Sequence, residues 1–132
     1  MRILVVEDDF VSRKLFTRIL ADFGTCDTAV NGLEAVDAYR QAWDACEPYD
    51  LILMDIMMPH LSGLEALERI REMERERGIA LGDSVRVIIV TAVDDPKNVS
   101  RAFFQGAAMS YLIKPIDKKK LIEEVRRLGF LK

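Results

Sequence analysis

The residues best suited to chemistry stand directly after short apolar runs. They are Glu7, Asp8 and Asp9 after Ile3–Val6, Asp55 after Leu51–Met54, Thr91 after Val87–Val90 and Lys114 after Tyr111–Ile113. Any one of them would fit an ordinary helix cap or turn. Their repeated position after four separate runs, with a lysine after the last, favours one shared pocket.

A pocket of that composition suits phosphoryl transfer. Carboxylates held close together repel one another, and some take up protons unless a cation neutralises them. Mg²⁺ is the natural cation because it binds through few carboxylates and leaves room for phosphate oxygens. The ammonium of Lys114 and the hydroxyl of Thr91 would offset charge on those oxygens. The residues alone therefore indicate phosphoryl chemistry at a carboxylate nucleophile.

The elements that would position these residues alternate along the chain. Short apolar runs rich in Val, Ile and Leu are typical of strands buried on both faces, and the segments between them have helical spacing. The predicted strands are Ile3–Val6, Cys26–Val30 (the weakest), Leu51–Met54, Val87–Val90 and Tyr111–Ile113. The predicted apolar helix faces are Leu15, Ile19 and Phe23; Leu33, Val36 and Tyr39; Leu64, Leu67, Ile70 and Met73; Val99, Ala102, Phe103 and Gly106; and Leu121, Val125 and Leu128.

Five strand–helix units in series predict an α/β fold, a doubly wound five-stranded parallel sheet with five helices on its two faces. Helix start signals agree, because Asn31 with Glu34 and Ser62 with Glu65 have the spacing of capping boxes. In such sheets the functional site lies beyond the carboxyl ends of the strands. The residues suited to chemistry are expected at that edge.

Composition limits the other functions. The 132 residues fit a single domain, 1–132. With 19 basic and 22 acidic residues the net charge is −3, so we expect no direct contact with nucleic acid. No segment is apolar for long enough to span a membrane and no signal peptide is evident, so we expect a cytoplasmic protein without membrane contact. Cys26 and Cys46 lack metal-ligand spacing and fit reduced thiols.

Four motifs resemble those of the response-regulator receiver family. They are Leu4–Asp9, Leu53–Pro59, Ile89–Ala92 and Tyr111–Pro115, and in this order they extend the resemblance over nearly the whole chain. The resemblance implies the flavodoxin-like strand order 2-1-3-4-5. It also implies a phosphoacceptor switch of two-component signalling, not an enzyme that turns over outside substrates.

The resemblance implies a role for each residue of the pocket. Asp55 would accept the phosphoryl group from a phosphohistidine on a sensor histidine kinase or a histidine phosphotransfer protein. Mg²⁺ would be bound directly by Asp8 and Asp55, through water by Glu7, and by the backbone carbonyl of Met57. Asp9 would lie outside this set, as a solvated residue near a helix N-terminus.

The switch itself would use residues of the last two strands. Lys114 would pair with the phosphoryl group or with Asp55, and its bond to Pro115 is a candidate cis peptide. Thr91 would follow the phosphoryl group inward and Tyr111 would change rotamer with it. The signal would leave through the surface of the fourth helix, the fifth strand and the fifth helix, which would bind a downstream protein.

Two residues are predicted to tune the lifetime of the phosphorylated state. The positions two after Asp55 and two after Thr91 are Met57 and Val93. In the family these side chains flank the water that hydrolyses the phosphoaspartate, and neither Met nor Val can orient a water by hydrogen bonding. A long-lived phosphorylated state is therefore expected.

Several alternatives remain open on the sequence. We expect a stand-alone receiver that serves chemotaxis or a phosphorelay; the alternative is a receiver domain cut from a longer response regulator. An aspartate-nucleophile phosphatase would want a second Asp where Met57 stands, and a flavin binder would want glycine in the acidic loop Glu7–Phe10. His60 fits a solvated loop residue, and the segment Gly78–Ser84 fits a solvated loop that is longer than usual for the family.

Overall fold

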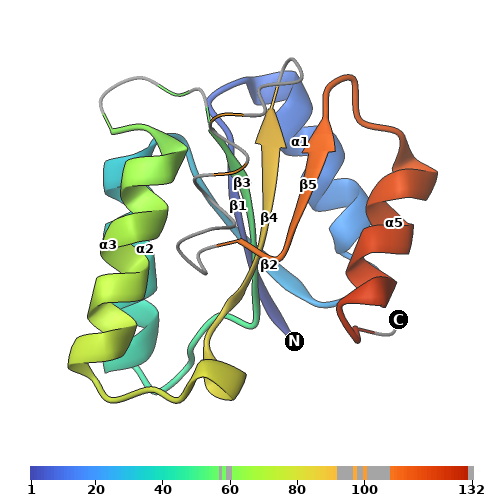
Figure 1. The fold of residues 1–132 in the computed structure, drawn as a ribbon. Helices are drawn as coiled ribbons and strands as arrows, with labels where there is room; N and C mark the ends of the chain where they lie inside the picture. The colour runs from blue at the N-terminus through green and yellow to red at the C-terminus, as the bar shows by residue number, and fades with distance from the viewer. Residues whose placement is uncertain (57, 59–60, 92–96, 98–99, 101–107, 131–132) are drawn as a thin grey trace.

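The computed structural model describes residues 1–56, 58, 61–91, 97, 100 and 108–130 (Figure 1). In these ranges the strands are β1 (Arg2–Val6), β2 (Thr25–Ala29), β3 (Leu51–Asp55), β4 (Arg86–Thr91) and β5 (Ser110–Ile113). The helices are α1 (Phe10–Leu20), α2 (Gly32–Asp44), α3 (Gly63–Glu76) and α5 (Lys118–Arg127), with a short 3-10 helix at Leu81–Asp83. The predicted fourth helix, with Val99, Ala102, Phe103 and Gly106, lies outside the described residues.

The strands form one parallel sheet in the order β2-β1-β3-β4-β5, as predicted. Successive side chains of a strand point to opposite faces, so each central strand contributes to two cores. On β1, Ile3 and Val5 pack with α1 and α5, whereas Leu4 and Val6 pack with α2 and α3. Figure 1 shows α2 and α3 on one side of the sheet and α1 and α5 on the other. The doubly wound architecture is therefore observed in the described ranges.

Two of the helix starts follow the predicted capping boxes. The Asn31 side chain accepts a hydrogen bond from the backbone N–H of Glu34 at 2.9 Å, directly before α2. The Ser62 hydroxyl accepts one from the N–H of Glu65 at 3.2 Å, directly before α3. These bonds satisfy N–H groups that the first helical turn leaves open, so the caps define where the helices begin.

The predicted apolar face of α1 is corrected at one position. Leu15 was expected in the core, but it is 43% exposed, whereas Phe16, Ile19 and Leu20 are buried. The spacing 16, 19, 20 and 23 is itself helical, and Leu15 lies about 90° around the helix from the centre of this buried stripe. Leu33, predicted on the buried face of α2, is likewise exposed.

A buried polar cluster joins α2, α3 and the start of β4. The Glu74 carboxylate accepts hydrogen bonds from the Tyr39 hydroxyl at 2.9 Å, from Arg71 Nη1 at 2.7 Å and from the Val85 backbone N–H at 2.8 Å. Glu74 and Arg71 are only 3% and 7% exposed. These bonds anchor the start of β4 to α2 and α3, directly after the segment Gly78–Ser84, most of whose described residues are exposed as predicted.

Trp43 lies near the end of α2, on the same side of the sheet. The Arg77 guanidinium is 5.9 Å from the centre of its ring, and Arg77 also pairs with Asp44 at 3.0 Å. Trp43 lines a small cavity together with Asp50 and Arg86, which stand at the amino ends of β3 and β4. It is therefore at the sheet edge opposite to the carboxyl ends of the strands.

None of the helices in the described ranges combines the length and apolar character needed to cross a bilayer.

Candidate functional site

The sheet register brings the predicted site residues to one edge. Val6 pairs with Met54, Asp55 pairs with Val90, and Thr91 pairs with Ile113. The residues at or just beyond these pairs therefore stand side by side at the carboxyl ends of β1, β3, β4 and β5. Figure 1 shows the arrowheads of β4 and β5 pointing to this edge.

Three acids form a cluster at this edge. Glu7, Asp8 and Asp55 each offer a carboxylate oxygen, and these oxygens lie within 4.8 Å of one another. Glu7 is fully buried and Asp55 is 4% exposed, whereas Asp8 is exposed to solvent. The cluster thus consists of two buried acids, Glu7 and Asp55, and one acid that solvent reaches, Asp8.

Lys114 is the positive charge next to the cluster. Its Nζ lies 2.6 Å from Glu7 Oε1 and 3.3 Å from Asp55 Oδ2, where it donates a hydrogen bond. The backbone N–H of Lys114 donates to the carbonyl of Thr91 at 2.7 Å, and the Lys114–Pro115 peptide bond is cis. One ammonium therefore faces two buried carboxyl groups.

The protonation of Glu7 reflects this crowding. The pKa of the Glu7 carboxyl is raised to about 8, chiefly by burial and also by the nearby Asp55, while Lys114 opposes the shift. Burial also pulls the pKa of the Lys114 ammonium down, but its contacts with Glu7 and Asp55 outweigh this, and the pKa lies above its usual value. Without another cation the site carries more carboxylate than its single ammonium balances.

The donor set fits a small hard cation. Glu7 Oε1 is buried and makes no hydrogen bond among the described residues, because the Lys114 ammonium contacts it outside hydrogen-bond geometry. An oxygen with unused acceptor capacity, next to the carboxylates of Asp8 and Asp55, is a suitable environment for a divalent ion that prefers oxygen ligands. The exposed Asp8 leaves an entry path from solvent.

Thr91 and Gly63 complete the described surroundings of Asp55. Thr91 closes β4 and is 3% exposed. Gly63 begins α3, and a Cβ built there would lie 2.1 Å from the Asp55 carbonyl oxygen, so only glycine fits. The N–H of Gly63 donates to the carbonyl of Ile56 at 3.0 Å. Sequence reasoning missed Gly63, although its place after the Ser62 cap and eight residues beyond Asp55 was the available signal.

The remaining predicted residues lie elsewhere. Asp9 is outside the acid cluster and caps α1, accepting a hydrogen bond from the N–H of Ser12 at 2.9 Å; hydrogen bonding with Ser12 holds the pKa of Asp9 below its usual range. Tyr111, on β5, is 40% exposed. Met57 and Val93 lie outside the described residues, so their predicted roles remain predictions.

A family model of the response regulator receiver domain matches residues 3–126. The chemotaxis protein CheY of Treponema pallidum (strain Nichols) is 35% identical over 127 residues, which span 94% of this chain and 79% of that protein. Hybrid signal transduction histidine kinase I of Dictyostelium discoideum is 38% identical over 125 residues, which span 94% of this chain but 7% of the kinase. Related sequences thus occur both as short proteins and as small parts of long ones.

Solved structures agree in fold. A chain of the CheX-CheY-BeF3-Mg²⁺ complex from Borrelia burgdorferi aligns over 100% of this chain and 90% of its own length, with a TM-score of 0.83 and 28% identity. A chain of the co-crystal structure of the Saccharomyces cerevisiae histidine phosphotransfer signaling protein Ypd1 with the receiver domain of Ssk1 aligns over 98% and 88%, with a TM-score of 0.85 and 28% identity.

Proposed function

This chain belongs to the response regulator receiver domain family of two-component signalling, and from that membership we propose that Asp55 accepts a phosphoryl group from a phosphohistidine. The observation that carries the proposal is the position of Asp55. Its carboxylate is almost fully buried within an acid cluster and 3.3 Å from the Lys114 ammonium. Receiver domains are phosphoacceptor switches, and no catalytic activity beyond self-phosphorylation and dephosphorylation is proposed for this one.

The transfer is a displacement at phosphorus. A carboxylate oxygen of Asp55 forms a bond to phosphorus while the nitrogen–phosphorus bond of the phosphohistidine breaks, and the imidazole leaves as a neutral ring after taking up a proton from solvent. The Lys114 ammonium offsets negative charge on the phosphoryl oxygens, and the Thr91 hydroxyl donates a hydrogen bond to one of them. As Thr91 moves toward the phosphoryl group, Tyr111 changes rotamer.

Asp8, Asp55 and the backbone carbonyl of Met57 would hold Mg²⁺ directly, with Glu7 acting through water. When bound, this ion supplies positive charge that binds phosphoryl oxygens and neutralises the acid cluster. The three clustered acids support this assignment, and so does the buried Glu7 Oε1, which is paired with the Lys114 ammonium but accepts no hydrogen bond from the described residues.

The test is direct phosphorylation with acetyl phosphate, with and without Mg²⁺, followed by intact mass. The expected result is one phosphoryl adduct that requires Mg²⁺ and is removed by hydroxylamine, which cleaves acyl phosphates. Absence of the adduct at saturating acetyl phosphate and Mg²⁺ would contradict the proposal.

Mg²⁺ is expected to stabilise the folded protein. A ligand that binds only the native state stabilises it by about 1–3 kcal/mol at ten to a hundred times its Kd. Thermal unfolding in excess Mg²⁺ should therefore give a higher Tm than unfolding in EDTA. Asp8→Asn should remove most of this difference, whereas Asp9→Asn, which changes an acid outside the cluster, should keep it. An equal loss in both variants would mean that Mg²⁺ acts through general charge screening.

The phosphorylated state is expected to be long-lived, because the predicted water-flanking residues Met57 and Val93 are apolar. Introducing Met57→Asn together with Val93→Glu should speed dephosphorylation about tenfold or more, since polar side chains can orient the attacking water. The rate is measured as loss of the adduct after acetyl phosphate is removed. An unchanged rate would show that these residues do not set the lifetime.

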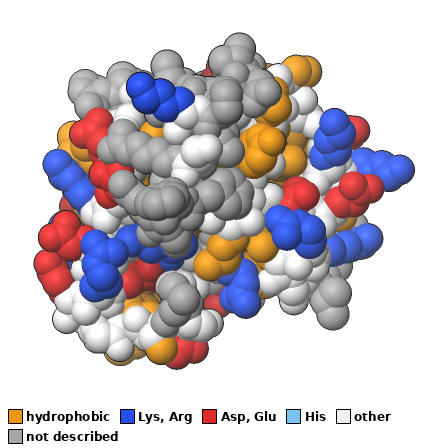
Figure 2. Space-filling view, in the orientation of Figure 1, with side chains coloured by type: hydrophobic (Ala, Val, Ile, Leu, Met, Phe, Trp, Pro, Cys, Tyr) orange, Lys and Arg blue, Asp and Glu red, His pale blue; other side chains and the backbone are white. Residues whose placement is uncertain are grey.

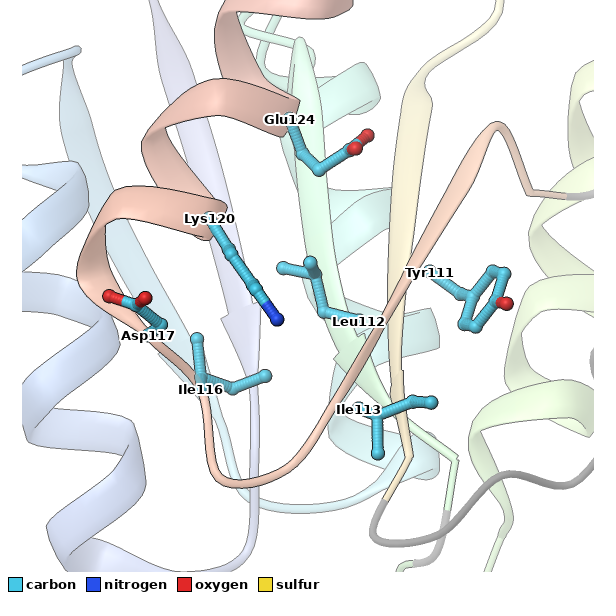
Figure 3. Close-up of a pocket in the computed structure, with 7 residues that line it drawn as sticks. All are labelled: Tyr111, Leu112, Ile113, Ile116, Asp117, Lys120 and Glu124. Carbon is cyan, nitrogen blue, oxygen red and sulfur yellow. The ribbon is translucent and has the colours of Figure 1, made fainter.

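For the output we propose the surface of β5 and α5 together with the predicted fourth helix. A groove of ≈ 340 Å³ runs between β5 and α5 and is lined by Tyr111, Leu112, Ile113, Ile116, Asp117, Lys120 and Glu124 (Figure 3). Figure 2 shows Lys and Arg side chains gathered over α5, which carries three lysines and two arginines. A groove with both apolar and charged lining residues, beside a basic helix, suits a partner segment with apolar and acidic side chains.

Receiver domains interact with histidine kinases or phosphotransfer proteins, and we propose such a protein as the phosphodonor of this chain. The fold shared with a chain of the Ypd1–Ssk1 co-crystal structure supports this class of partner. Both a chemotaxis role and a phosphorelay role are compatible with the proposed chemistry.

A further inference from the structure

The first residue of α2 lies directly against the turn that leads into α3. The backbone N–H of Gly32 donates a hydrogen bond to the carbonyl of Leu61 at 3.2 Å. A Cβ built on Gly32 would overlap that carbonyl oxygen and lie 2.9 Å from the Leu61 Cβ, so this approach requires glycine. Leu61 is itself 6% exposed and packs in the core with Ile56 and Leu64. The turn at Leu61 therefore has little room to move away from α2.

The same turn holds the backbone at the phosphoacceptor. Gly63 follows Leu61 by two residues, donates its N–H to the carbonyl of Ile56 at 3.0 Å and lies against the carbonyl of Asp55. On the other side, the N–H of Ile56 donates to the carbonyl of Val90 on β4 at 2.9 Å. The backbone at Asp55 and Ile56 is thus held between β4 and the start of α3.

Helix α2 is in turn fixed where it stands. Ala35 and Val36, one turn after Gly32, are 0% and 6% exposed. The Tyr39 hydroxyl donates a hydrogen bond to the Glu74 carboxylate on α3 at 2.9 Å. A side chain at position 32 could not be accommodated by moving α2 alone, so it would displace the turn at Leu61 and, through Gly63, the backbone of Asp55.

We propose that Gly32 is a positioning residue for the phosphoacceptor, and this inference rests on the proposed function. None of the clustered acids belongs to α2. By its close approach to Leu61, Gly32 lets the start of α3 take the place that sets the Asp55 carboxylate relative to Asp8 and Lys114. A Cβ at Gly32 requires a shift on the order of 1 Å before its distance to the Leu61 oxygen becomes an ordinary contact. An error of about 1 Å at a reacting group can slow a reaction about a hundredfold.

Gly32→Ala tests the proposal, at a temperature where thermal unfolding shows the variant to be folded. At saturating acetyl phosphate and Mg²⁺, the rate of labelling should fall by about tenfold or more. The Kd for Mg²⁺, measured by isothermal titration calorimetry, should rise several-fold, because Asp55 is one of the proposed ligands. A residue that serves stability alone would change neither quantity in the folded protein.

Gly24→Ala and Asn31→Ala are the matched controls. A Cβ on Gly24 would overlap the Met1 carbonyl oxygen, which is the same kind of clash at the amino end of β2. Asn31→Ala removes the cap of α2 but keeps the backbone contact between Gly32 and Leu61. Both controls should have a lower Tm and should be labelled within about twofold of the wild-type rate. Unchanged labelling of Gly32→Ala, or equal slowing in the controls, would overturn the positioning role.

A measurement on the wild type decides the matter if Gly32→Ala does not fold. Assigned amide ¹H–¹⁵N spectra are recorded during a Mg²⁺ titration. The Gly32 resonance should shift, because ligation of Asp55 reaches Gly32 through Gly63 and Leu61. The resonances of Gly24 and Gly82, which have no such connection, should stay in place. A Gly32 resonance that does not move would contradict the proposal.

The two proposals fail differently. If acetyl phosphate labels the wild type on Asp55 and labels Gly32→Ala at the same rate, the positioning role is wrong and the phosphoacceptor remains. If the wild type is not labelled, the proposed function itself is wrong.

Discussion

Replacing Asp55 with asparagine is expected to abolish the Mg²⁺-dependent phosphoryl adduct. An amide oxygen is neutral and a poor nucleophile, so the acyl phosphate cannot form, although the side chain keeps its shape. Among the described acids, only Glu7 also contacts the Lys114 ammonium, and Glu7 is fully buried, so it cannot replace Asp55 as phosphoacceptor. Intact mass after incubation with acetyl phosphate should show the unmodified protein alone.

Asp50→Asn provides the control for this experiment. Asp50 stands at the amino end of the same strand, where its side chain accepts a hydrogen bond from the Arg2 N–H at 2.8 Å, an interaction that asparagine preserves. This variant should be phosphorylated like the wild type. A persistent adduct in Asp55→Asn, mapped by peptide mass to another acid, would move the phosphoacceptor away from Asp55.

The second large effect is expected on stability, from Glu74→Gln. The change removes a negative charge that faces the buried Arg71 guanidinium and also receives hydrogen bonds from Tyr39 and Val85. Removing one partner of a buried ion pair is costly because the other charge, here on Arg71, stays buried without its partner. We expect the free energy of unfolding to fall by about 3 kcal/mol. Urea titration followed by circular dichroism measures this loss.

The solvent-exposed Glu72 on the same helix gives the comparison. Glu72→Gln should change the free energy of unfolding by less than about 0.5 kcal/mol. Acetyl phosphate should still label folded Glu74→Gln, since the cluster lies away from Asp55. A loss below about 1 kcal/mol for Glu74→Gln would mean that water enters the cluster in solution and screens the pair.

Sequence patterns predict those features of the fold that depend on neighbouring residues alone. The carboxyl ends of the strands follow from apolar runs that stop at a polar residue, and the starts of α2 and α3 follow from their capping boxes. Because parallel strands end at one edge, the convergence of Glu7, Asp55 and Lys114 could also be predicted. The strand order was implied by family resemblance and is observed in the structure.

Sequence patterns failed where the answer depends on partners distant in the chain. Tyr39 and Glu74 are 35 positions apart, and the helical periodicity of the sequence does not predict the hydrogen bond between them. Leu15 has helical spacing with Ile19, but the face of α1 that packs against the sheet runs through Phe16 and Ile19 and leaves Leu15 exposed. Gly63 is required by the backbone of Asp55, and a sequence does not show which backbone lies against it.

The position of Trp43 decides how this protein can be followed optically. It is the single tryptophan of the chain. It lies near the amino ends of the strands, whereas Asp55 lies at the carboxyl end of β3. Its emission should shift to longer wavelength when unfolding transfers the indole into water. The same emission should stay constant when Mg²⁺ or a phosphoryl group is bound at the far edge. Intrinsic fluorescence is therefore a readout of folding for this protein, and ligand binding at Asp55 needs a label placed elsewhere.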